Sequence, residues 1–159
     1  MSFLSSLFRK RSQPLLWTGK VLSASDVRLL LNTNELTADK SYAEVNSTSL
    51  TNFYEWYADK LSTFGVSRND MRLDCDNFAG LYQNFSQLKY YLAQWESNNI
   101  PDAEALAIGS VWYRPTYFAL AHAVNVALTE RGVLYIEPQT GAIVTLSATE
   151  QASIFKINI

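Results

Sequence analysis

The chain has 159 residues, with 13 Lys and Arg against 15 Asp and Glu, and a formal net charge of -2 at pH 7. Hydrophobic residues make up 48% and charged residues 18%, which excludes a disordered or fibrous chain and suffices for one domain with a core. Basic and acidic residues nearly balance, so the chain has no net positive charge to attract nucleic acid. No apolar run reaches the roughly 18 residues of a membrane span, and a single Cys excludes an internal disulfide.

Residues 1–22 are interpreted as a basic amphipathic arm. The first eleven, MSFLSSLFRKR, place four apolar side chains at helical spacing ahead of three basic ones. A secretory signal has its charge first and a longer apolar stretch after it. We therefore expect no signal peptide, and a location in the cytoplasm or in a phage particle. The arm either packs on the domain or docks on a membrane surface or a protein assembly partner.

Residues 23–159 are expected to form one domain, with helices before a sheet. Ser23 and Asp26 are helix-capping residues ahead of an apolar run over 27–31. The spacing of aromatic residues predicts a helix over 50–64, with its apolar stripe in the core and Gly65 as its end. A third helical pattern covers residues 78–95, which puts Cys75 at or just before a helix N-terminus.

The last third is typical of strands. Candidate strands cover residues 105–113, 118–129, 133–137 and 142–146, and residues 154–159 are a candidate edge strand. Short turns join the strands, at Arg131-Gly132 and at PQTG, so we expect them to be antiparallel. The predicted fold class is α+β.

Three residues suggest nucleophilic catalysis. Cys75 is the only Cys and His122 the only His, and Glu137 lies one tight turn beyond the predicted strand of His122. A helix N-terminus and an adjacent imidazole favour a thiolate, and a carboxylate orients the imidazole. The backbone amide of Cys75 and the side chain of Asn69 are candidate oxyanion donors. The alternative is a small buried Cys, a core His and a surface Glu.

The segments DCDNFA (74–79), HAVNVAL (122–128) and IEPQTG (136–141) together resemble the papain-like cysteine peptidase domain at the C-terminal end of a mushroom agglutinin family, the Marasmius-type lectins, and its small phage and bacterial relatives. The resemblance covers about residues 67–147. It implies a papain-like or transglutaminase-like fold with Cys75 as nucleophile, His122 as base and Glu137 as its orienting group. The agglutinin's sugar-binding repeats are absent, so it implies no lectin activity.

The resemblance also implies a divalent-cation site at Asp74 and Asp76, with Asn77 assisting. Oxygen ligands of this kind suit calcium or manganese, although nothing in the sequence alone requires a cofactor. Two carboxylates beside a thiol disfavour its ionisation. They must therefore be turned away, hydrogen-bonded or bound to a cation if Cys75 is to react.

Two functions follow from these expectations. The first is a cysteine hydrolase, a peptidase or amidase, that acts on a peptide or protein substrate. The second is a non-enzymatic virion or tail protein of a phage, built on the same fold and held in its assembly by the N-terminal arm. Fold alone does not decide between them.

Overall fold

The computed structural model describes residues 15–33, 38–67, 70, 73–96, 100–117 and 120–159. Four helices are present in this part of the chain, α1 (Ala24–Leu31), α2 (Leu50–Thr63), α3 (Cys75–Glu96) and α4 (Ala148–Ala152). The strands are β1 (Trp17–Ser23), β2 (Ser41–Val45), β3 (Ala105–Leu106), β4 (Ile108–Tyr113), β5 (His122–Thr129), β6 (Gly132–Ile136), β7 (Ile143–Val144) and β8 (Lys156–Asn158).

The eight strands form one mixed sheet in which β1, β2, β5, β4 and β8 lie side by side in that order. The antiparallel β5–β6 and β6–β7 pairs confirm the prediction for the C-terminal strands, and β8 is the predicted edge strand. In contrast, β2 runs parallel to β3 and β5. The fold class is α+β as predicted, with two further strands from the N-terminal half in the sheet.

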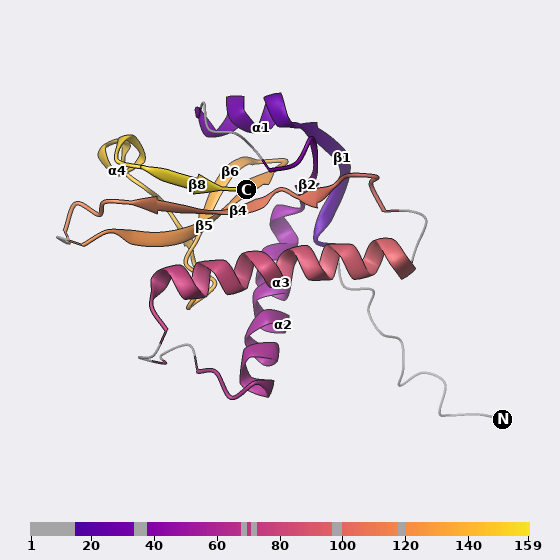
Figure 1. The fold of residues 1–159 in the computed structure, drawn as a ribbon, viewed down its shortest axis with the longest axis horizontal. Coiled ribbons are helices and arrows are strands. Elements are labelled where there is room, and N and C mark those ends of the chain that lie inside the picture. Colours follow the sequence, from indigo (N-terminus) through magenta and orange to yellow (C-terminus); the bar gives the residue numbers. More distant parts are fainter. Residues whose placement is uncertain (1–14, 34–37, 68–69, 71–72, 97–99, 118–119) are drawn as a thin grey trace.

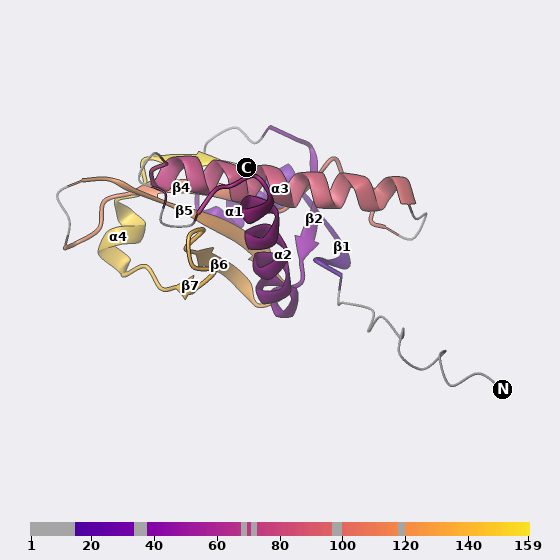
Figure 2. The same ribbon diagram turned by 90° about the horizontal axis from the view of Figure 1, so that it is seen from below.

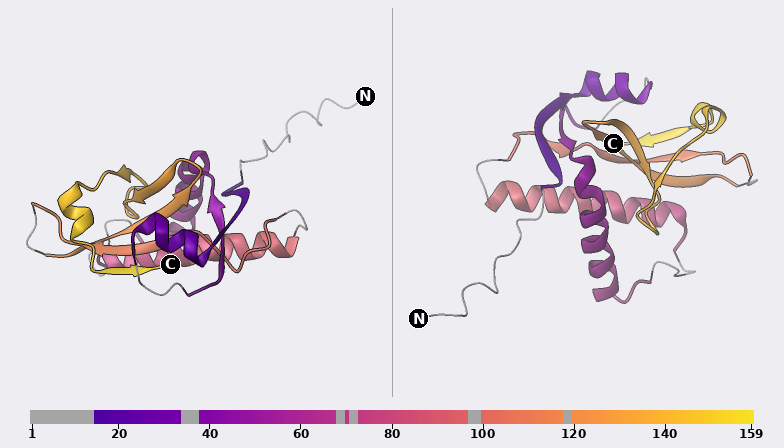
Figure 3. Two further views of the ribbon diagram at one scale, coloured as in Figure 1. Left: turned by 90° about the horizontal axis from the view of Figure 1, so that it is seen from above. Right: turned by 180° about the vertical axis from the view of Figure 1, so that it is seen from behind.

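The helices lie on two sides of the strands. Figure 1 shows α2 and α3 below them and α1 above, and Figure 3 shows the same arrangement from behind. The longest helix, α3, packs on β4 and β5. In Figure 2 the β6–β7 hairpin lies beside α2. The sheet thus has α3 on one face, and α2 adjoins its β6–β7 turn.

Aromatic side chains of α2 and α3 pack together in the larger of two hydrophobic clusters of the core. Phe53 and Tyr57 of α2 pack edge-on against Tyr82 of α3, with ring centroids 4.9 and 5.1 Å apart. Such edge contacts add to the burial of large apolar surface. The stripe predicted from spacing is therefore core, except that Phe64 is 71% exposed just after α2 ends.

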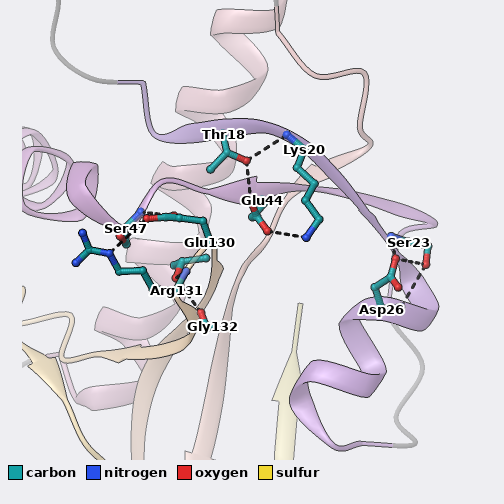
Figure 4. Close-up of polar contacts among 10 residues, drawn as sticks. Thr18, Lys20, Ser23, Asp26, Glu44, Ser47, Glu130, Arg131 and Gly132 are labelled. Carbon is teal, nitrogen blue, oxygen red and sulfur yellow. Dashed lines mark hydrogen bonds and ion pairs between the residues drawn. The ribbon is translucent and has the colours of Figure 1, made fainter.

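Polar contacts attach the N-terminal strand to the sheet (Figure 4). Glu44 of β2 is buried, and its carboxylate accepts hydrogen bonds from Thr18 Oγ1 at 2.9 Å and Lys20 Nζ at 3.0 Å, both on β1. The boundary predicted at residue 22 falls inside β1, so residues 17–22 belong to the sheet. Residues 1–14 of the arm lie outside the described residues.

The carboxylate of Glu150 caps α4 and joins it to the β4–β5 connection. It accepts N–H bonds from Ser147 at 2.9 Å and Thr116 at 3.1 Å, and these bonds hold the pKa of Glu150 below the usual 4.5. A carboxyl group whose pKa is lower in the folded than in the unfolded state stabilises the fold at any pH above its unfolded-state pKa. This stabilisation is lost as the pH falls through the folded-state pKa.

We expect Glu150→Gln to weaken the pH dependence of stability below about pH 5. The measurement is the thermal unfolding midpoint between about pH 3 and 7, with exposed Glu55→Gln as the matched control. If the unfolding midpoint of Glu150→Gln falls as steeply on acidification as that of the unaltered chain, the lowered pKa of Glu150 does not contribute to acid sensitivity.

Candidate active site

His122 and Glu137 are in direct contact. His122 is the first residue of β5, and Glu137 follows the last residue of β6, the strand paired with β5. The His122 Nε2 atom lies 2.8 Å from Glu137 Oε2, and both side chains are mostly buried, at 28% and 19% exposed. A carboxylate only accepts hydrogen bonds, so Nε2 carries the proton. In the neutral ring this leaves Nδ1 as the basic nitrogen, free to take a proton from another group.

The turn after β6 fixes the Glu137 carboxylate from its other side. Glu137 Oε1 accepts the backbone N–H of Gln139 at 3.3 Å. The Glu137 carbonyl accepts the N–H groups of Thr140 and Gly141, at 3.2 and 2.8 Å. Gly141 has a φ of 73°, a left-handed conformation that glycine adopts without strain. Both carboxylate oxygens of Glu137 are therefore in use.

Cys75 is the first residue of α3, as predicted. Asp74 precedes it and caps the helix, because its Oδ1 accepts the N–H of Asn77 and Asn77 Oδ1 accepts the N–H of Asp74, both at 3.3 Å. This reciprocal pair satisfies two donors at the start of the helix. Asp74 therefore has a structural role as the cap of α3. The half-buried Cys75 thiol lies at the helix N-terminus, where the helix dipole favours negative charge.

Tyr113 is the cross-strand neighbour of His122. It pairs with His122 across β4 and β5, and the two rings meet edge-on with centroids 5.9 Å apart. Burial raises the pKa of Tyr113 to about 12, and the nearby Tyr117, Glu150 and Glu137 add smaller effects. The Tyr113 hydroxyl therefore stays protonated at neutral pH.

The structure brings His122 and Glu137 together, but no hydrogen bond joins Cys75 to His122 in the described part of the chain. Asn125 faces α3, whereas Val124 and Val126 pack with Tyr113 on the other face. Side chains alternate along a strand, so His122 has the parity of Val124. By this alternation the His122 side chain projects from the face opposite to α3, the helix whose first residue is Cys75.

Asn125 ties α3 to the strands next to the site. Its side chain is fully buried, and Nδ2 donates to the carbonyls of Ala79 in α3 and Gly109 in β4, both at 2.9 Å. From the sequence we expect this residue to point away from His122 and to have no catalytic role. Its contacts are those of a clamp that positions the helix bearing Cys75.

The predicted cation site has few ligands in the described residues. Asp74 and Asp76 interact with each other: a hydrogen bond from Asp76 lowers the pKa of Asp74, and the same bond and burial raise that of Asp76. The residues that the structure describes contain no group of three or more His, Cys, Asp or Glu side chains able to hold a metal. Calcium takes six to eight oxygens, so two adjacent carboxylates are an incomplete set. Asn69, the predicted side-chain oxyanion donor, lies outside the described residues.

The α+β fold is shared with a mushroom lectin. Comparison with solved structures finds a "PSL1a-E64 complex", with a TM-score of 0.58 and 17% identity over 84% of this chain and 47% of that one. It also finds Polyporus squamosus lectin bound to the human-type influenza-binding epitope Neu5Aca2-6Galb1-4GlcNAc, with a TM-score of 0.60 and 17% identity over 87% and 49%. No protein-family model and no curated protein matches the chain.

The chain spans about half the length of each of these two structures. At 17% identity the likeness concerns the fold alone. It agrees with the mushroom-lectin part of the resemblance seen in the sequence. In the part of the chain that the structure describes, no helix has the length and apolar character needed to cross a membrane.

Proposed function

We propose that this chain is a papain-like cysteine hydrolase that cleaves peptide or amide bonds. The observation that carries the proposal is the 2.8 Å contact between His122 Nε2 and Glu137 Oε2. It leaves Nδ1 of the neutral His122 ring as a proton acceptor, and the half-buried thiol of Cys75 lies at a helix N-terminus.

The reaction would proceed by acyl transfer. His122 Nδ1 takes the thiol proton as Cys75 Sγ bonds to the carbonyl carbon of the substrate, and the imidazolium then protonates the leaving amine as the C–N bond breaks. Water, deprotonated by His122, attacks the thioester and releases the acid and the thiol. The Cys75 amide is the candidate donor to the oxyanion.

The separation of Cys75 from His122 is compatible with this proposal. Hydrogen bonds between catalytic groups in unliganded enzymes are often long and tighten only when substrate binds. One structure of the same fold is a complex with E64, an epoxide that alkylates nucleophilic thiols. This supports a reactive Cys in the fold, and the carbohydrate ligand of the other neighbour plays no part in the proposal.

Reaction with E64 tests the proposal, read out by the intact mass of the protein. We expect a single adduct on Cys75 that forms at least tenfold faster in the folded protein than in the same chain unfolded in guanidinium chloride. The unfolded chain is the matched control because it presents the same single thiol without the folded site around it. Equal rates in the two states would contradict the hydrolase and favour the non-enzymatic assembly role.

The predicted calcium or manganese site stays a prediction. The E64 reaction is therefore run with calcium, with manganese and with EDTA. A rate that depends on the ion would locate a cation near Asp74 and Asp76, where two carboxylates flank the thiol.

A further inference from the structure

We propose that Tyr54 of α2 is a positioning residue for the Glu137 carboxylate, an inference that rests on the proposed function. Tyr54 is distant in sequence from all three predicted catalytic residues, and no short motif includes it. The proposal is that its hydroxyl fixes the turn after β6, and that this turn holds Glu137 against His122.

The contact between Tyr54 and the turn has two parts. The hydroxyl donates a hydrogen bond to the backbone carbonyl of Gln139 at 2.7 Å. The ring lies directly on Gly141, where a Cβ would overlap the ring atoms. Tyr54 therefore contacts the turn both at the middle and at its last residue, and Gly141 is required for close approach as well as for its positive φ.

The turn transmits this contact to the site through hydrogen bonds. The peptide that follows Pro138 places the Gln139 N–H on Glu137 Oε1, while the Gln139 carbonyl accepts the Tyr54 hydroxyl. The other carboxylate oxygen, Oε2, holds His122 Nε2. A displaced Gln139 would release one oxygen of Glu137 and let the carboxylate rotate away from the imidazole.

One side of this turn borders open volume rather than packed side chains. Pro138 and Gln139 border a pocket of about 420 Å³, whose opposite wall is formed by α2 and residues 65–67. Tyr54 borders the same pocket and spans from α2 to the turn. Beside this open volume, the hydrogen bond from Tyr54 ties the turn to α2 and is expected to influence the turn more than it would in a filled core.

The test uses Tyr54→Phe, which keeps the ring on Gly141 and removes only the hydroxyl. The chain has one His, so the Nε2 proton of His122 gives one resonance in ¹⁵N-labelled protein. We expect this resonance to move upfield and its exchange with water to quicken about fivefold, the effect of one lost hydrogen bond of ordinary strength. The alkylation rate of Cys75 is expected to fall by about the same factor.

Tyr91→Phe is the matched control, since it removes a hydroxyl from an exposed tyrosine of α3 and is expected to leave the His122 signal unchanged. Gly141→Ala, which pushes the ring off the turn, is expected to act in the same direction as Tyr54→Phe. A folded Tyr54→Phe protein with an unchanged His122 signal would overturn the proposal. If the signal moves while no variant, His122→Ala included, alters Cys75 alkylation, the positioning role stands and the hydrolase proposal fails.

Discussion

Replacing His122 with alanine is expected to slow the alkylation of Cys75 by iodoacetamide about a hundredfold near pH 6. The physical reason is that the thiolate is the reacting species, and in the proposed mechanism His122 Nδ1 takes the proton of the thiol. The rate is followed by intact mass, since the chain has one thiol. Glu137→Gln keeps the shape of the side chain but loses the charge that orients the imidazole, and it is expected to cost about tenfold.

The two variants are compared with Tyr91→Phe, an exposed change on α3, and each must show the thermal unfolding midpoint of a folded protein. A His122→Ala rate within a factor of two of the unaltered chain would mean that Cys75 reacts without His122. In that case the His122–Glu137 contact would be structural.

The largest loss of stability is expected from Asn125→Asp. The Asn125 amide is fully buried and donates to two carbonyl oxygens. A carboxylate there would face both oxygens with no proton to donate, and such a buried unpaired charge costs about 3 to 5 kcal/mol. Urea unfolding at pH 7 measures the loss, with Asn84→Asp at an exposed position of α3 as the control.

The loss should shrink on acidification. Burial favours the neutral form of a carboxyl group and raises its pKa above the unfolded-state value. The Asn125→Asp protein therefore regains stability when the pH is below the unfolded-state pKa of Asp. It loses this stability as the pH rises through the folded-state pKa. A deficit that is small, or equal at pH 4 and pH 7, would contradict the clamp between α3 and the strands.

Helices and C-terminal strands were predictable because their signals are local. The residues of the apolar stripe lie within α2, and the capping residues Ser23 and Asp26 lie within the first turn of α1. The structure confirms both predictions. The short helix α4 was missed, although Ser147 and Glu150 form the capping box that signals such a start.

The two N-terminal strands were missed for a physical reason. The strand β1 is at the edge of the sheet and exposes most of its side chains, so it lacks a hydrophobic alternation. The adjacent β2 buries the acidic Glu44, whose partners on β1 are more than twenty residues away. Its parallel pairing with β3 and β5 depends on contacts across the chain, which a local pattern does not contain.

The candidate site shows the same division. Cys75 at a helix start and Glu137 beside His122 follow from element boundaries and one short turn. Tyr54 and Tyr113 reach the site from other elements, through α2 and β4. No short sequence motif marks either Tyr113 or Tyr54 as part of the site. Their roles depend on packing between elements.

Cleavage of a peptide mixture by the purified chain tests the central claim most directly. The account predicts new peptide termini, identified by mass spectrometry, that appear with the unaltered chain and are lost by at least a thousandfold with Cys75→Ser. The Tyr91→Phe protein is expected to cleave at the unaltered rate. Cleavage that persists in the Cys75→Ser protein, or a folded unaltered chain that cleaves nothing and leaves E64 unreacted, would contradict a cysteine hydrolase.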